Sequence, residues 1–249
     1  MTPNDSLRQA DVLFQALGLL EPIGAEERRA LRRLGGPVVR IGEGSYVSRH
    51  GDYPAASALL IEGFLCRQRL LEEGQRQIFS LHYPGDLAGF ETLRLRLLDH
   101  DIRALTDCHV SYIPHGALES LMREYPGLAA ALWKSALREG AVVREWMAGI
   151  GRRPALQRLA HLICEIFVRM RVLGRTSDDR FYLPLNQTDM ADILGLSLVH
   201  VNRMAGLLRR SGLIEWRHQH MSISDWPQLR DLARFDPAYL QFHRPPLLT

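Results

Sequence analysis

The chain has 249 residues, of which 46% are hydrophobic and 24% charged, as is typical of a globular protein large enough for two modest domains. No apolar run reaches the roughly 18 to 20 residues of a membrane-spanning helix, and the N-terminus lacks the basic region and small-residue cleavage site of a signal peptide. We therefore expect a cytoplasmic protein with no membrane partner, which keeps its scattered cysteines, Cys66, Cys108 and Cys164, as buried thiols.

The net charge of +3 is divided unevenly along the chain. Residues 151–249 hold 14 Arg against 9 Asp or Glu, a balance of +5, which leaves −2 for residues 1–150. Lys134 is the one lysine, so the excess is arginine, whose planar guanidinium suits phosphates and guanine edges. The C-terminal part is the better candidate for contact with a nucleic acid, although many basic faces are merely solvated.

The first 113 residues contain a predicted helical region followed by a predicted β region. Residues 10–34 are predicted to be helical, with a break near residues 22–24. From residue 37 to residue 113, short apolar or alternating runs are separated by glycines, a pattern typical of short antiparallel strands joined by tight turns. We expect a β-sandwich or jelly roll here.

A long helix is predicted from Pro126 to about Ile150. Along it, apolar and small residues alternate at spacings of four and three, as in a helix that pairs with a parallel partner. A helix of about 25 residues is roughly 37 Å long, which is longer than a helix that only covers a small β-sandwich needs to be. We interpret the stripe as a dimer interface, the alternative being that it packs on the chain's own β domain. The stripe comprises Ala129, Trp133, Ala136, Gly140, Val143, Met147 and Ile150.

Gly151 and Pro154, in "GRRPAL", indicate a hinge, because Pro154 fits the first turn of a new helix. The predicted organisation is therefore a β domain with flanking helices over residues 1–125, the long helix over 126–150, and a C-terminal domain over 151–249. In the last of these, a short strand is expected at residues 181–185.

Two short helices follow this strand. Asn186 is placed to cap the first, with Asp189 at its third position, close to a capping box. Gly195 ends that helix and Ser197 caps the next. The apolar residues expected between the two helices are Met190, Ile193, Leu194, Leu196, Val201, Met204 and Leu208.

The outer face of the second helix then carries Leu198, Val199, His200, Asn202 and Arg203, where helix-turn-helix motifs read base edges. Residues 213–216 and 221–224 are predicted to form a two-stranded wing, turned through residues 217–220. The C-terminal fold is thus a winged helix-turn-helix. A C-terminal extension follows the wing and is predicted to pack on this domain through Leu232, Phe235 and Tyr239.

Nearly the whole chain resembles the cyclic-AMP receptor protein/FNR (Crp/Fnr) family of bacterial transcription regulators. The resemblance is carried by "GD" at residues 51–52, "PGD" at 84–86, "GRRPALQRLAHLI" and, most specifically, "MADILGLSLVHVNRMAGLLRRSGLI". It implies an α+β chain with an N-terminal β-roll sensor domain (a jelly roll like those that bind cyclic nucleotides), a long dimerisation helix and a C-terminal winged helix-turn-helix. It also implies a homodimer that binds an inverted repeat in double-stranded DNA, with half-sites roughly 34 Å apart, and that contacts RNA polymerase if it activates transcription.

The sequence departs from the family in the effector pocket. Members that bind cyclic nucleotides carry a G-E-[LI] element and, about nine residues later, an Arg-[ST] pair for the cyclic phosphate. Here Gly89, Phe90 and Glu91 stand at the first element, and Leu98 and Asp99 replace the pair. Because a carboxylate repels a phosphate, we predict that this protein does not bind cyclic AMP as typical members do.

The other effectors of the family depend on cofactors, and we predict none for this chain. The three cysteines fall one short of the four ligands of an iron–sulfur cluster, and no metal-ligand set is apparent. Haem stays open as an alternative, with Cys66, His82 and His100 eligible as axial ligands by residue type only. Oxidation of a cysteine is another alternative, for which the sequence shows no environment that would lower a thiol pKa.

The recognition helix also departs from the family. Arg203 matches the arginine of the V-x-R element and is the best candidate for a base contact, whereas Val199 stands at the usual glutamate position. Leu198 and Val199 suit thymine methyl groups, and His200 or Asn202 can donate to a base or a phosphate. An operator with an A/T-leaning stretch is therefore predicted, the alternative being that Leu198 and Val199 pack inside the domain. Candidate phosphate contacts are Arg217 and Arg152.

The sequence leaves two alternatives to a regulator that senses a signal. A cupin-type enzyme is not favoured, because the sequence lacks a clustered His-His-Glu set and any GxSxG, P-loop or GxGxxG motif. The second is a regulator that is always competent for DNA binding, with the β-roll as a scaffold. The sequence does not decide the effector, the operator, or activation against repression.

Overall fold

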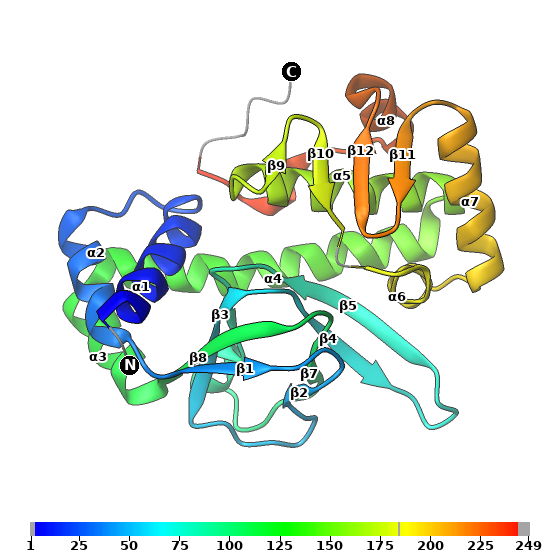
Figure 1. Ribbon diagram of the computed structural model, residues 1–249. Helices are drawn as coiled ribbons and strands as arrows, with labels where there is room; N and C mark the ends of the chain where they lie inside the picture. Colours follow the sequence, from blue (N-terminus) through cyan, green and yellow to red (C-terminus); the bar gives the residue numbers. More distant parts are fainter. Residues whose placement is uncertain (1–2, 184, 244–249) are drawn as a thin grey trace. The chain divides into compact units, whose positions relative to one another are not determined.

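The structure is a computed structural model that describes residues 3–183 and 185–243 (Figure 1). It divides into two compact units, Met1–Gly140 and Ala141–Thr249. The division falls inside the long helix α4 (Pro126–Arg152), whereas the sequence placed the domain limits at the two ends of that helix. The reason is that the last turns of α4 belong to the second core: the Trp146 indole donates a hydrogen bond of 2.7 Å to Glu165.

The helices of the first unit follow the predicted pattern. The region expected to be helical with one break forms α1 (Pro3–Gly18), α2 (Ala25–Leu31) and the short 3-10 helix η1 (Arg32–Leu34). After the β region come α3 (His115–Glu124) and the long α4. Across the described residues of both units, no helix is both long enough and apolar enough to span a lipid bilayer.

Two four-stranded sheets form the β-roll of the first unit, and every strand pair is antiparallel, which confirms the predicted β domain. One sheet has the order β1 (Val38–Ile41), β8 (Cys108–Pro114), β3 (Ala56–Glu62), β6 (Leu87–Ala88). The other has the order β2 (Tyr46–Ser48), β7 (Asp101–Ala104), β4 (Leu65–Leu70), β5 (Arg76–His82). The 3-10 helix η2 (Phe90–Leu93) follows β6.

Strand β3 is buried on both faces, because it lies between two apolar cores. Ala58 and Leu60 belong to a core shared by strands of the two sheets. Leu59 and Ile61, on the opposite face, belong to the core made with the helices. This explains why β3 reads as a continuous apolar run rather than as an alternating one. The turn into β4 requires Gly63 (φ 89°), where a Cβ would lie 2.4 Å from the Asp107 carbonyl oxygen.

The second unit contains the end of α4 and a winged helix-turn-helix (Figure 1). Its helices are α5 (Ala155–Val172), α6 (Gln187–Leu194), α7 (Leu198–Arg210), α8 (Trp226–Ala233) and the 3-10 helix η3 (Pro237–Leu240). Its sheet has the order β11 (Ile214–Arg217), β12 (His220–Ile223), β10 (Arg180–Tyr182), β9 (Thr176–Ser177).

Two details of this unit differ from the sequence prediction. Arg217 and His220, expected in the turn of the wing, pair across the strands, so the turn is only His218–Gln219, with His218 at φ 55°. Strand β9 was not expected, because two residues carry no readable period. Pro184, in the strand predicted at residues 181–185, and residues 244–249 of the C-terminal extension lie outside the described residues.

Candidate nucleic-acid interface and sensor site

The turn between α6 and α7 is built by local capping, as the sequence predicts. The Asn186 side chain accepts a hydrogen bond from the Asp189 backbone N–H (2.9 Å), and the Asp189 carboxylate accepts one from the Asn186 N–H (3.1 Å). Gly195 ends α6 at φ 60°, a conformation that favours glycine. Ser197 then caps α7 by accepting from the His200 N–H at 3.3 Å. These caps fix where the second helix begins.

The apolar side chains predicted between the two helices are buried. Six of them, Met190, Ile193, Leu194, Val201, Met204 and Leu208, are at most 7% exposed, and Leu196 is half-buried. On the outer face Leu198 is 45% exposed and Val199 78% exposed, so neither belongs to the core of the domain. Asn202 and Arg203 are also exposed, and His200 is half-buried. The structure thus places all five predicted readers on one accessible face.

Two of these readers contact each other. An Arg203 terminal nitrogen lies 3.1 Å from the His200 Nε2. Because a guanidinium can only donate, this contact requires a neutral imidazole with the lone pair on Nε2. Arg203 keeps further N–H groups for a guanine edge, which takes two. From the sequence, His200 and Arg203 are separate candidate contacts, whereas the structure brings their side chains together.

The predicted phosphate contacts are both exposed. Arg217 ends strand β11, its side chain is 84% exposed, and it lies 3.7 Å from the Glu215 carboxylate. A shallow hollow lies beside it on the wing. The hollow is lined by Arg180, Glu215, Arg217, His220, Met221 and Ser222. Arg152 is exposed as the last residue of α4.

The predicted dimer stripe on α4 is only partly free. In the first unit Trp133 is 37% exposed and meets the Phe90 ring edge-on at 5.4 Å, while Ala136 packs against the helical core. Leu137, which the sequence interpretation missed, is 71% exposed. Ala129 and Gly140 are half-buried.

In the second unit Met147 is 67% exposed and Val143 half-buried. Ile150 is 38% exposed and also lines a pocket within the unit. The exposed apolar side chains of α4 are therefore the predicted Trp133, Met147 and Ile150 together with Leu137, which was not predicted.

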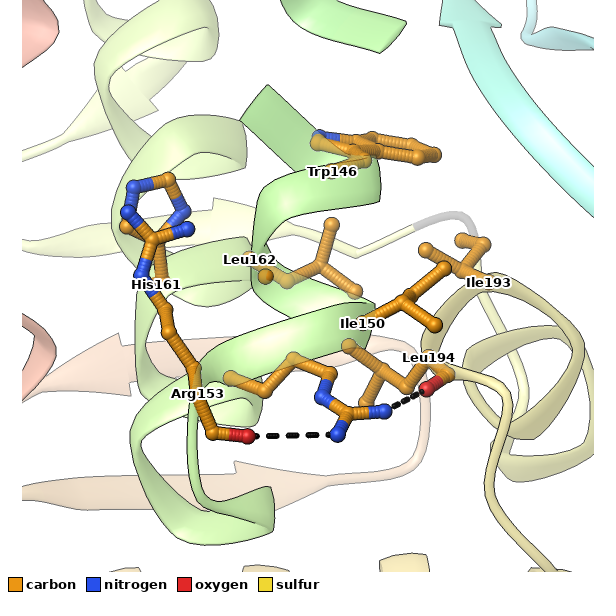
Figure 2. A pocket seen from close by; sticks show the side chains of 9 residues that line it. Trp146, Ile150, Arg153, His161, Leu162, Ile193 and Leu194 are labelled. Carbon is orange, nitrogen blue, oxygen red and sulfur yellow. Dashed lines mark hydrogen bonds between the residues drawn. The ribbon is translucent and has the colours of Figure 1, made fainter. Parts of the chain in front are cut away.

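This pocket lies where α4 turns into α5 (Figure 2). Its apolar lining includes Trp146, Ile150, Leu162 and Ile193. The Arg158 guanidinium donates to two carbonyl oxygens, that of Leu194 at the end of α6 and that of Arg153 just after α4, the latter at 3.2 Å. One side chain thus ties the end of α4 to the helix-turn-helix. The sequence interpretation did not single out Arg158, because only the fold brings those two carbonyls together.

The residues at the effector-pocket positions do not suit a cyclic phosphate. Leu98 is fully buried, and the Asp99 side chain is 80% exposed, with its carboxylate 2.6 Å from the His100 Nδ1. Glu91 is already paired, with Arg67 at 3.0 Å and with the His100 Nε2 at 3.3 Å. Burial alone raises the pKa of Glu91, but Arg67 and His100 hold it at about 2. No cationic side chain stands at the Arg-[ST] positions.

The structure separates the other two residues predicted for this pocket. Gly89 has φ 75° and begins η2, and Phe90 points into the helical core. Leu98 belongs instead to the core between the sheets. Phe90 and Leu98 therefore lie in different apolar cores.

A buried polar network that the sequence interpretation missed surrounds Glu91. Arg67 lies 3.6 Å from Glu139, whose carboxylate also accepts a 3.1 Å hydrogen bond from Ser80, and Arg138 pairs with Asp86 at 2.9 Å. Arg138 and Glu139 stand on the first-unit part of α4, so the network ties that helix to the β-roll. In the sequence they look like ordinary surface charges between stripe positions.

The three candidate haem ligands differ in their burial and in their hydrogen-bond partners. His100 has both ring nitrogens within 3.3 Å of carboxylate oxygens. Cys66 is fully buried and its thiol contacts Gln68. His82 is 1% exposed, and among the described residues neither of its ring nitrogens has a hydrogen-bond partner. Burial, and then Arg67, lower the pKa of His82 to about 4. No three His, Cys, Asp or Glu side chains of the described chain gather as a metal site.

A β-roll followed by a long helix and a winged helix with an accessible reading face defines a DNA-binding regulator of two domains. Residues 38–125 match the cyclic nucleotide-binding domain family, and residues 157–232 match the Crp-like helix-turn-helix domain family. Both matches fall within the domains expected from the sequence.

Named relatives agree with these matches. The chain is 29% identical over 225 residues to the nitrogen fixation regulation protein FixK of Bradyrhizobium diazoefficiens, covering 90% of this chain and 93% of that one. It is also 29% identical over 197 residues to the transcriptional activator protein FnrL of Cereibacter sphaeroides, covering 78% and 79%. The structure of FixK2 from Bradyrhizobium japonicum superposes with a TM-score of 0.71 at 22% identity, over 79% of this chain and 96% of that one. The chain belongs to the Crp/Fnr family of transcription regulators.

Proposed function

We propose that this regulator binds an inverted-repeat operator as a homodimer and reads each half-site with the outer face of α7. The observation that carries the proposal is the accessible face formed by Leu198, Val199, Asn202 and Arg203 on a capped, well-packed helix. With Val199 where relatives of this type carry a glutamate, the half-site has an A/T-leaning stretch beside the guanine that Arg203 reads. Selection of bound sequences from random DNA tests this: an inverted repeat supports it, and enrichment of no sequence contradicts it.

The homodimer is supported by the large apolar side chains that α4 leaves exposed. Leu137 is 71% and Met147 67% exposed, and apolar side chains that gather on one helix, unlike singly scattered ones, mark an interaction surface. Leu137→Glu is expected to convert a dimer to a monomer in analytical ultracentrifugation, because two carboxylates would meet in the apolar seam. Leu70→Glu, at a position 57% exposed on the β4–β5 hairpin, is the matched control and leaves the mass unchanged. A monomeric wild type contradicts the proposal.

We propose further that the β-roll either senses a signal other than cyclic AMP or serves as a scaffold, and that it holds no haem or iron–sulfur cluster. The support is the absence of a cation at Leu98 and Asp99, together with the engagement of Glu91 by Arg67 and His100. Calorimetry with cyclic AMP is expected to show no binding at micromolar concentration. The visible spectrum of protein purified from cells is expected to show no haem or cluster band.

A redox-sensing regulator is the alternative within the same family, and the cysteines give it little support. Burial raises the pKa of the Cys108 and Cys164 thiols, which keeps them protonated and unreactive at neutral pH. DNA affinity is therefore expected to be the same before and after mild peroxide treatment.

The relatives named as activators support a further part of the proposal: the DNA-bound dimer contacts RNA polymerase, in the cytoplasm, without any catalytic step of its own. Transcription in vitro from a promoter with the selected operator upstream is expected to rise when the protein is added. A fall in transcription at every operator position would instead assign repression.

A further inference from the structure

The C-terminal segment beyond the family match is built into the DNA-binding unit. The helix-turn-helix match ends at residue 232, but the chain continues through the end of α8 and through η3. Phe235 is 3% exposed and Leu240 is fully buried. Two rings of this segment enclose His161 of α5: Phe235 meets it edge-on at 5.1 Å, and Tyr239 stacks on it at 5.8 Å with an interplanar angle of 20°.

The same segment shares a buried carboxylate with the end of α4. Glu165 of α5 is fully buried, and its Oε2 accepts a 2.7 Å hydrogen bond from the Tyr239 hydroxyl and another of 2.7 Å from the Trp146 indole. Burial, and then Glu165, raise the pKa of Tyr239 well above its usual value, so the hydroxyl stays a donor. Two elements far apart in the chain therefore converge on one oxygen atom of α5.

A second contact lies beside the first and involves the same elements. The His161 ring, covered by Tyr239, has its Nε2 3.3 Å from the Glu145 carboxylate of α4, and Glu145 also pairs with Arg153. From α5 the connection runs on through Arg158 to the last carbonyl of α6. The end of α4 is thus connected, through buried and half-buried groups, to the helix that precedes the recognition helix.

We propose that residues 233–241 are a brace that fixes the angle between the end of α4 and the winged helix, with Tyr239 as its positioning residue. The inference rests on the proposed function, because that angle sets how far apart the two recognition helices of a dimer stand. When this angle is fixed, the dimer tolerates little change in the spacing of the half-sites. When the angle is free to vary, the dimer tolerates a larger change in spacing, because the recognition helices then adapt to a longer or shorter operator.

The test compares Tyr239→Phe with wild type in the full-length protein. The substitution removes one hydroxyl and keeps the ring stack on His161. Tyr182→Phe is the matched control, since its hydroxyl also bonds to a side chain, Gln219 at 3.2 Å, but on the wing sheet. The DNA probes are the inverted repeat selected by the wild-type protein, the same repeat lengthened by one base pair between its half-sites, and a single half-site.

We expect the preference of Tyr239→Phe for the selected spacing to fall at least about threefold, with the affinity for a single half-site unchanged. A purely structural role of Tyr239 would weaken all three DNAs alike. Native trypsin digestion gives a second readout at the Arg152–Arg153 bond, since Pro154 blocks cleavage after Arg153; cleavage there is expected to be faster than in wild type and in Tyr182→Phe.

Unchanged spacing preference together with an unchanged cleavage rate would overturn the brace. If Tyr239→Phe does not fold, Trp146→Phe removes the other donor to Glu165 and is expected to give the same two changes. If the wild-type protein selects no inverted repeat, the proposed function fails, and the cleavage rates still decide whether the brace exists.

Discussion

In the first unit Arg138 is buried and Arg67 nearly so, and both pair with carboxylates, whereas on α7 Arg203 stays exposed beside a neighbouring histidine. The same residue type thus has two uses. Buried guanidinium groups hold the first unit together and are costly to lose, because they leave carboxylates without a counter-charge. An exposed guanidinium adds little to stability and remains available to DNA. Stability and DNA affinity should therefore respond to different arginines.

The largest effect is expected from Arg138→Met. The substitution leaves Asp86 and Glu139 in the interior without this cation and should lower the free energy of unfolding by about 3 to 5 kcal/mol. Arg94→Met is the control, because the ion pair of Arg94 with Glu119 is exposed and is worth less than about 1 kcal/mol. Urea unfolding measures both. Equal losses would remove the distinction between buried and exposed arginines.

The next effect is a loss of stability in acid through His82. Its pKa is about 4 in the folded protein and near 6.5 in the unfolded chain, so between these values the unfolded chain binds the proton and the folded one does not. Stability is therefore complete above pH 6.5 and falls as the pH drops toward 4, by about 2 kcal/mol at pH 5.

His82→Gln should remove this part of the pH dependence in urea unfolding at pH 7.5 and pH 5. His218→Gln, on the exposed turn of the wing, is the control and should keep the wild-type dependence. The same dependence in His82→Gln would assign the acid sensitivity to other groups.

On the DNA side, Arg203→Ala should cost about 1 to 3 kcal/mol of operator binding and relax specificity at one base pair. Arg217→Ala or Arg152→Ala should weaken selected and random DNA alike and reduce the slope of log K against log salt by about one unit. Fluorescence anisotropy at several salt concentrations separates the two. A uniform loss for Arg203→Ala would contradict its role as a base reader.

The smallest effect concerns His200. If it acts by holding Arg203, His200→Ala should cost less than about 1 kcal/mol of operator binding, and nothing further in the Arg203→Ala background. Asn202→Ala, on the same face, is the control and should add independently to Arg203→Ala. A His200→Ala effect that persists without Arg203 would indicate that the imidazole contacts DNA directly.

Much of the DNA-binding site was predictable because helix capping and helical period depend on residues that are close together in the sequence. Asn186, Gly195 and Ser197 act on residues within four positions of themselves, and the period of a helix separates the buried Val201 and Met204 from the exposed Val199 and Arg203. The antiparallel β-roll was predictable as a class, from glycine-separated apolar runs. Its strand order was not, because pairing depends on contacts between distant segments.

The sequence by itself determined where the two helices of the helix-turn-helix begin and end and which side chains they expose, since capping and helical period depend only on near neighbours. Only the tertiary structure decided that Arg67 meets Glu139, that Tyr239 and Trp146 share Glu165, and that Leu137 lies on the exposed face of α4. Charged residues carry no mark of burial in the sequence. Whether they lie in water or beside a counter-charge depends on which distant segments the fold brings together.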